Sequence, residues 1–271
     1  MQSINSLSLA PDVNDWLTNS HHSRILHVFD HACNLINEDR EVLSIVTSQI
    51  GNGPFNLVID DNVLFSDYLS LQSPISNSPN HLNLGSLTIN TIDATIWSPH
   101  PDWEKLHAQK EDILNQLTKL PITNYQFPHS PASNLLVSAL ANADLPSAIN
   151  AAQQLAGLGI GLTPAGDDFI LGAILAAWII YPPEIASVVA NDVANTAAPL
   201  TTSLSAAWLN SAGRGEAGIL WHNFFDALIF NDSIIVQKAV EELLAVGHTS
   251  GYDALAGFVG TTMFWKVKDC I

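Results

Sequence analysis

The residues with the clearest potential for chemistry lie in one glycine-rich segment, residues 157–168, which reads GLGIGLTPAGDD. Its four glycines cost conformational entropy, so packing alone does not explain them, and they indicate positive φ angles or close approach of a ligand to the backbone. Thr163 is placed to cap a helix that has Pro164 as its first residue. Such a helix start offers free N–H groups and the positive end of the helix dipole to an anion. We therefore predict that a small anionic substrate binds Gly159, Gly161, Thr163 and Gly166.

Two adjacent carboxylates, Asp167 and Asp168, fall in the first turn of that helix. One interpretation is that they only complement the helix dipole, which needs no ligand. The other is that they bind Mg²⁺, or that one of them acts as an acid or base on a substrate amine or amide. Because a negative pair beside an anion site is best explained by a cation between them, we predict that both are catalytic and that both are ligands of Mg²⁺.

A second candidate segment, residues 247–253, reads GHTSGYD. Ser250 and Asp253 match a capping box at a helix start, and that role alone would explain both. His248, beside two hydroxyls, would alternatively serve as a catalytic acid or base. We predict that this segment faces the same cleft as the glycine-rich one. Its expected substrate-binding residues are Thr249, Ser250, Gly251 and Asp253.

Arg214 lies in a turn between two expected helices, residues 211–216, and is the only arginine after residue 100. A guanidinium there could hold a carboxylate or phosphate through two hydrogen bonds, so Arg214 is a candidate substrate-binding residue. The alternative is a surface ion pair with Glu216.

Composition narrows the class of protein. The chain has 26 acidic and 9 basic residues and a net charge of −17, which disfavours nucleic acid and anionic membranes as partners. Residues 1–11 lack the pattern of a signal peptide, and the longest apolar run, residues 169–181, is too short to span a bilayer. The two cysteines, Cys33 and Cys270, do not demand a disulfide. A soluble cytoplasmic protein is expected.

The elements that must position these residues change in kind near residue 100. Before it, β-branched runs and turn signals predict strands, with residues 24–36 ambiguous between helix and strand and residues 77–83 expected as a loop. The expected strands are 42–50, 55–59, 82–89 and 92–97, and residues 63–65 would return as a hairpin. After residue 101, apolar residues at helical spacing predict helices at 103–120, 134–143, 146–156, 168–180, 199–212, 216–230, 233–246 and 251–267.

These expectations give an α+β fold, in which an N-terminal antiparallel β unit is followed by a C-terminal helical bundle. We place the β-rich unit at residues 1–100 and the helical domain, which carries the glycine-rich motif, at residues 101–271.

The two candidate segments together resemble the AllH-like family, which includes a subunit of oxamate carbamoyltransferase. Residues 159–172 are similar to the family signature GxGLTPxGDDxxxG, and residues 247–257 are similar to its GxTSGxDxLxG run. Weaker similarity covers Thr202–Ser205, Ala212–Gly213, Gly53–Pro54 and Trp97–Pro99, so the resemblance extends over most of the chain.

The resemblance implies transfer of a carbamoyl group between phosphate and oxamate, in company with other protein subunits. The motif residues would then hold carbamoyl phosphate or the small acid. The alternative is a non-catalytic subunit that binds an anion or metabolite, or that serves in assembly.

Overall fold

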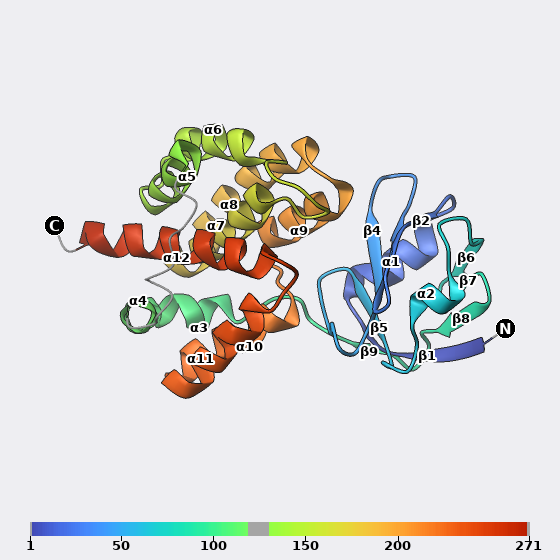
Figure 1. Ribbon diagram of the computed structural model, residues 1–271. Coiled ribbons are helices and arrows are strands. Elements are labelled where there is room, and N and C mark those ends of the chain that lie inside the picture. Colours follow the sequence, from blue (N-terminus) through green and yellow to red (C-terminus); the bar gives the residue numbers. More distant parts are fainter. Residues whose placement is uncertain (1, 119–129, 270–271) are drawn as a thin grey trace. The chain divides into compact units, whose positions relative to one another are not determined.

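The computed structural model describes residues 2–118 and 130–269. The chain divides into two compact units, residues 1–99 and 100–271. The first is built on a β-sheet and the second is helical (Figure 1), which confirms the expected α+β class. No helix within the described ranges is long and apolar enough to cross a membrane.

The N-terminal unit is a mixed sheet in which antiparallel pairs predominate. Its strands run in the order β2-β3-β4-β5-β1-β8-β7-β6, and β9 also pairs with β1. The parallel pairs are β4 with β5, β1 with β8 and β1 with β9. The strands are β1 (Gln2–Leu9), β2 (Arg24–Val28), β3 (Ala32–Ile36), β4 (Val42–Thr47), β5 (Asn56–Ile59), β6 (Ile75–Ser78), β7 (His81–Leu84), β8 (Leu87–Asn90) and β9 (Thr95–Ile96).

Several strand predictions differ from the structure because the chain turns at other residues than expected. The ambiguous residues 24–36 form a β2–β3 hairpin. Residues 82–89 are not one strand, because Gly85 takes a positive φ of 55° and turns the chain between β7 and β8. Residues 77–83, expected as a loop, belong largely to β6 and β7. The hairpin return at residues 63–65 was also wrong, since Phe65 begins the short helix α2 (Phe65–Tyr68).

The sheet buries its apolar side chains beneath helix α1 (Pro11–Asn19). Val13, Trp16 and Leu17 of α1 join the cluster formed by the strand residues. Cys33 lies fully buried in β3, and this burial raises the pKa of its thiol to about 12, so it is unreactive. Cys270 lies outside the described residues.

The second unit is built from helices α3 to α12. The expected helix at 103–120 is divided at Gln109, and residues 119–120 lie outside the described ranges. Helix α8 was not expected. The elements are α3 (Trp103–Ala108), α4 (Lys110–Leu117), α5 (Pro131–Ala141), α6 (Leu145–Leu155), α7 (Ala165–Ile180), α8 (Pro183–Ala197), the 3-10 helix η2 (Ala198–Leu200), α9 (Ser203–Gly213), α10 (Ile219–Phe230), α11 (Ser233–Leu244) and α12 (Ser250–Asp269).

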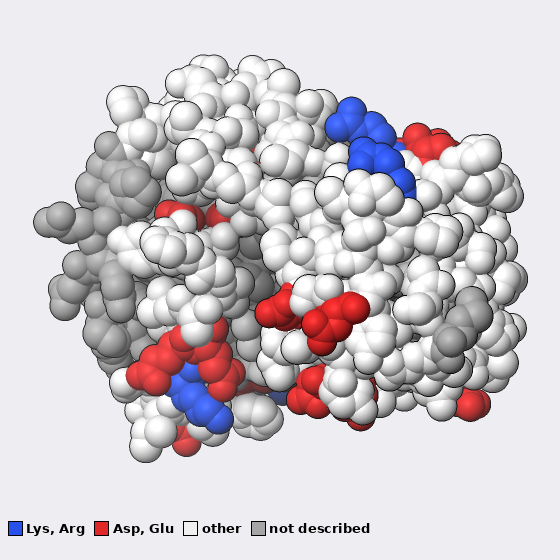
Figure 2. All heavy atoms as spheres, turned by 45° about the vertical axis from the view of Figure 1, so that its right-hand side comes forward, with Lys and Arg blue, Asp and Glu red and all other residues white. Residues whose placement is uncertain are grey.

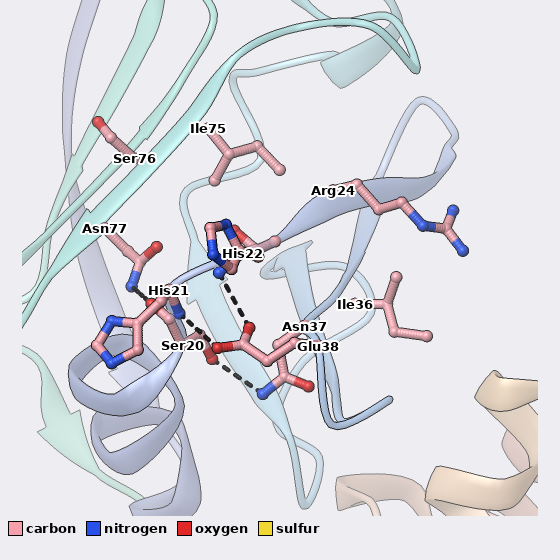
Figure 3. Close-up of a pocket in the computed structure, with 11 residues that line it drawn as sticks. Ser20, His21, His22, Arg24, Ile36, Asn37, Glu38, Ile75, Ser76 and Asn77 are labelled. Carbon is pink, nitrogen blue, oxygen red and sulfur yellow. Dashed lines mark hydrogen bonds between the residues drawn. The ribbon is translucent and has the colours of Figure 1, made fainter.

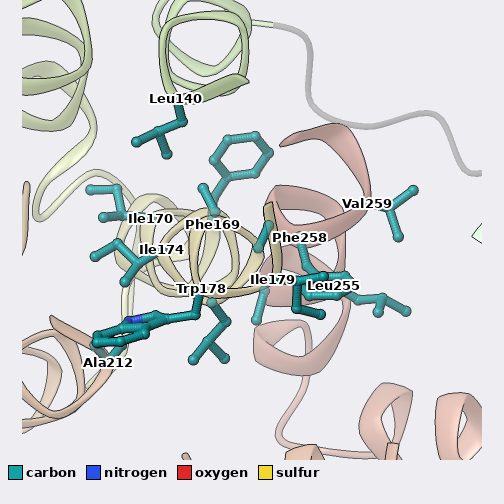
Figure 4. Packing of buried hydrophobic residues seen from close by; sticks show 14 of the residues in the cluster. Leu140, Phe169, Ile170, Ile174, Trp178, Ile179, Ala212, Leu255, Phe258 and Val259 are labelled. Atoms are coloured by element: carbon teal, nitrogen blue, oxygen red, sulfur yellow. The ribbon is translucent and has the colours of Figure 1, made fainter. Parts of the chain in front are cut away.

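Helices α7 and α12 pack against each other almost backbone to backbone in the centre of this unit (Figures 1 and 4). A Cβ atom on Gly172 would lie 1.7 Å from the carbonyl oxygen of Ala254, and one on Gly257 would lie 2.0 Å from that of Phe169. Only glycine fits at these positions. Larger apolar side chains, among them Ile170, Ile174, Leu255, Phe258 and Val259, fill the space around the crossing.

We predict that Gly257→Ala destabilises the protein by roughly 3 kcal/mol or more, because the methyl group must push α7 and α12 apart. Gly260→Ala in the same helix is the matched control. Its Cβ would meet only a side-chain methyl of Val137, at 3.2 Å. Urea unfolding of both variants measures the difference. Equal stability of the two variants would show that the close crossing does not constrain the fold.

Candidate functional site

The N-terminal ends of α7 and α12 bring the two candidate segments together. The hydroxyl oxygens of Thr163 and Ser250 lie 2.9 Å apart and share a hydrogen bond. Both hydroxyls also lie beside the carboxyl group of Asp168 and act to lower its pKa. Residues 87 positions apart in sequence therefore form one site.

Asp168 is the most unusual residue of this site. Its side chain is only 9% exposed, and its Oδ2 atom is sealed from solvent without a hydrogen-bond partner in the described part of the chain. Burial raises the pKa of this carboxyl to about 7. The hydrogen bond from Ser250 opposes the shift, whereas the neighbouring charges of Asp253 and Asp167 add to it.

Asp253, in the first turn of α12, repeats these features. It is 6% exposed, and its Oδ2 atom likewise has no partner among the residues described. Burial raises the pKa of this carboxyl, and a hydrogen bond from Thr249 opposes the shift. Asp168 and Asp253, here called the acidic pair, thus present two buried oxygen atoms that the surrounding protein leaves uncommitted.

Asp167 differs from Asp168 because its side chain anchors residues 157–164, here called the glycine loop. Its Oδ1 atom accepts a hydrogen bond from the backbone N–H of Gly157 at 2.7 Å, and its Oδ2 atom accepts one from the hydroxyl of Thr201. Thr202 holds the other end of the loop by donating to the carbonyl oxygen of Leu162 at 2.6 Å. Thr202 also caps α9. The contact from Thr201 was not predicted from the sequence.

The glycine loop has the backbone form that its composition predicts. Gly159 and Gly161 have φ angles of 131° and 101°, which other residues rarely adopt. No backbone N–H of residues 159–163 donates a hydrogen bond to another described residue, so these amides remain available to a ligand. The side chain of Ile160, at the tip of the loop, is 96% exposed.

The amides of the first turn of α7 are less available than predicted. The N–H of Gly166 donates to the carbonyl oxygen of Leu158, and those of Asp167 and Asp168 donate to that of Pro164. Any anion would therefore be held by the loop rather than by the helix start itself.

Both predicted helix caps were wrong. Helix α7 begins at Ala165, after Pro164, and has no side-chain cap, so the Thr163 hydroxyl is free to reach Ser250. Helix α12 begins at Ser250, which places Ser250 inside the helix rather than at the capping position of a capping box. Both hydroxyls therefore serve the contact between the two segments.

Two of the predicted substrate-binding glycines are explained by packing. A Cβ on Gly166 would lie 2.1 Å from the carbonyl oxygen of Leu155, and one on Gly251 would lie 1.8 Å from that of Leu243. Each lets a helix start lie directly on the end of another helix.

His248 and Arg214 stand apart from the acidic pair in their contacts. His248 is exposed in the turn before α12. The guanidinium of Arg214 donates to both carboxylate oxygens of Glu216, at 2.9 and 2.7 Å, and Glu216 is only 7% exposed. The ion pair with Glu216 is therefore formed, and Arg214 also donates to the hydroxyl of Ser211 at 3.3 Å.

The magnesium prediction remains a prediction. The described residues contain no group of three or more His, Cys, Asp or Glu side chains placed to hold a metal ion. Both carboxylate oxygens of Asp167 already accept hydrogen bonds within the protein. The donor set for a cation would then have to include hydroxyl oxygens, water or substrate.

A pocket of about 660 Å³ in the N-terminal unit is a separate feature (Figure 3). In it, the Glu38 carboxylate accepts hydrogen bonds from the backbone N–H groups of His21 and His22, at 2.9 and 3.0 Å. The backbone N–H group of Glu38 itself, followed by those of His21 and His22, lowers the pKa of this carboxyl to about 2. Glu38 thus fixes the turn between α1 and β2, and the pocket contains none of the predicted site residues.

Charged side chains are sparse on the face of the molecule shown in Figure 2, where most surface atoms belong to uncharged residues. This agrees with a chain in which only 13% of residues are charged. No lysine or arginine is among the groups that perturb Asp168 or Asp253. Hydroxyl groups, rather than a lysine or arginine, therefore oppose the rise in pKa of the acidic pair.

We predict that Asp168 makes folding stability depend on pH. Its folded pKa, about 7, lies above the ordinary value of 3.8, so its contribution to stability is complete below the ordinary value and is lost as the pH rises through about 7. From acid to about pH 8, the free energy of unfolding of the wild type should fall relative to that of Asp168→Asn by on the order of 2–4 kcal/mol. Urea unfolding across this range measures it. A constant difference would mean that Asp168 is an ordinary carboxylate.

Comparison with known families gives two matches that together cover most of the chain. Residues 155–262, which include both candidate segments, match the family model described as oxamate carbamoyltransferase subunit AllH. Residues 5–96, which form the β unit, match the AllH family N-terminal domain. No solved structure matches the chain. The two matches together cover most of the sequence, and the chain belongs to the AllH family.

Proposed function

We propose that this chain is a subunit of a carbamoyltransferase that moves a carbamoyl group between phosphate and the amide nitrogen of a small acid such as oxamate. The family description supports the reaction class. The observation that carries the proposal is Asp168, a buried carboxyl group with one uncommitted oxygen, held by two hydroxyls where two helices begin. Such a group is costly to stability and is typical of a functional site.

The reaction needs a proton acceptor. The amide nitrogen of oxamate is a weak nucleophile and attacks the carbonyl carbon of carbamoyl phosphate. A C–N bond forms, the C–O bond to phosphate breaks, and the amide nitrogen loses one proton. The proton passes first to a base and then to the departing phosphate, so that atoms and charge balance. In the reverse direction the same group donates the proton to the amide nitrogen.

Asp168 suits this role because of its surroundings. A general acid or base works best when its pKa lies near the working pH, and burial brings the pKa of Asp168 to about 7. The hydroxyls of Ser250 and Thr163 lie beside this carboxyl group, and either can donate to it. Its uncommitted Oδ2 atom is the one that would face the amide.

The glycine loop would receive the phosphate group. The amides of residues 159–163 have no acceptor in the described parts of the chain, and positive φ angles at Gly159 and Gly161 allow successive N–H groups to face one anion. Anchoring of the loop by Asp167 and Thr202 provides the preorganisation that such electrostatic binding requires.

A second role, in subunit assembly, is favoured by one observation. Ile160 is 96% exposed at the tip of a loop whose base is fixed by hydrogen bonds. A large apolar side chain presented in this way can enter a pocket on another protein. The two roles are compatible, and they make different predictions for variants.

We predict that Asp168→Asn lowers kcat for carbamoyl transfer by roughly 100-fold or more, because asparagine cannot accept the proton. The thermal midpoint should not fall, since the variant removes a buried charge. The assay uses the chain with its partner subunits, carbamoyl phosphate and oxamate, with Mg²⁺ or with a chelator. Asp192→Asn, which removes an exposed carboxylate from α8, is the matched control.

Other outcomes separate the alternatives. Turnover unchanged in Asp168→Asn would remove the catalytic assignment. If at the same time Ile160→Ser prevented association with the partner subunits, the chain would be an assembly subunit. Loss of activity with the chelator, restored by Mg²⁺, would support the magnesium prediction.

A further inference from the structure

The acidic pair offers two hydrogen-bond acceptors that nothing within the described protein uses. We propose that the Oδ2 atoms of Asp168 and Asp253 bind the two N–H groups of a primary amide, so that the site selects an amide over a carboxylate or an ammonium group of similar size. The inference rests on the proposed function for the identity of its ligand. It goes further in naming which chemical group is recognised and in giving Asp253 a direct part in that recognition.

The two uncommitted oxygen atoms require a hydrogen-bond donor. Buried polar atoms almost always have a hydrogen-bond partner, and leaving one unpaired costs about 1–3 kcal/mol. Ser6 provides the only other buried side-chain atom without a partner in the described ranges, and it lies in the β unit. Within the helical unit, both unsatisfied atoms therefore belong to the acidic pair.

A ligand that satisfies both oxygen atoms must carry two donors. A primary amide carries two N–H groups on one nitrogen, which can donate to two different oxygens. Asp168 and Asp253 lie in the first turns of two helices that are held in close contact by Gly172 and Gly257. Rigid elements of this kind keep two acceptors in fixed relation, as recognition of one small group requires.

Charge disfavours the other small groups that could bind the acidic pair. A carboxylate has no donor and would be repelled by the two aspartates. An ammonium group has donors but must leave water to enter a buried site, and that desolvation is expensive for an ion. A neutral amide supplies donors without that penalty. A buried water molecule also has two donors and is the alternative occupant.

The experiment compares three ligands of similar size by calorimetric titration of the full chain. Oxamate carries an amide next to its carboxylate, oxalate carries a second carboxylate in that place, and glycine carries an ammonium group. We expect oxamate to bind roughly tenfold or more tightly than either of the others. This comparison needs no variant and therefore does not depend on how a substitution affects folding.

Asp253→Asn then tests the second acceptor. Asparagine can present a donor where the aspartate presented an acceptor, so the affinity for oxamate should fall roughly tenfold and the preference over oxalate should shrink to about threefold or less. Asp192→Asn on α8 is the matched control and should keep the wild-type preference.

The outcomes are decisive in both directions. Equal affinity for oxamate and oxalate, tighter binding of oxalate or glycine, or no binding of oxamate would overturn the inference and leave water as the occupant. A preference unchanged in a folded Asp253→Asn variant would overturn the part assigned to Asp253. Selective binding of oxamate without any carbamoyl transfer by the assembled subunits would instead leave this recognition standing and refute the proposed function.

Discussion

The close contact between α7 and α12 is the constraint on which the site depends. Gly172 and Gly257 remove the side-chain layer that normally separates two helices, so that each helix meets the backbone of the other. Side chains in the first turns of the two helices then have little freedom to move apart. Asp168 and Asp253 are held beside each other by this backbone geometry, although like charges in a buried place repel. The packing glycines and the acidic residues of the signature are thus parts of one arrangement.

Burying two carboxyl groups without a cation is unfavourable, and the protein does little to relieve it. Hydroxyls from Thr163, Ser250 and Thr249 satisfy part of the hydrogen-bonding capacity, but one oxygen of each carboxyl is left over. A fold selected for stability alone would replace such a pair by apolar residues, which is often neutral or stabilising. Retention of the pair, at the junction of the two motifs, is the physical reason for placing the function here rather than in the polar pocket beside Glu38. In that pocket, each oxygen of the Glu38 carboxylate accepts a hydrogen bond from a backbone amide.

Sequence patterns predicted the fold class and the meeting of the two segments, and they failed where one residue type has two uses. Glycine allows positive φ at Gly159 and Gly161, as expected, but it serves helix packing at Gly166 and Gly251, and composition does not distinguish these uses. Strand β1 was missed because residues 2–9 are rich in serine and asparagine, which disfavour strands, yet pairing on both sides fixes this segment in the sheet. Helix α8 was also missed, although its buried alanine and valine side chains recur at helical spacing.

The twin aspartates show why neighbouring identical residues need not share a role. Successive residues of a helix point about 100° apart, so Asp167 and Asp168 cannot face the same neighbour. Asp167 faces the glycine loop, and its two oxygens accept hydrogen bonds from the Gly157 amide and the Thr201 hydroxyl, whereas Asp168 faces α12. The first anchors the loop, whereas the Oδ2 atom of the second has no partner among the described residues. Adjacent aspartates of one helical turn can thus serve different parts of the proposed site, one by anchoring the loop and the other by facing the neighbouring helix.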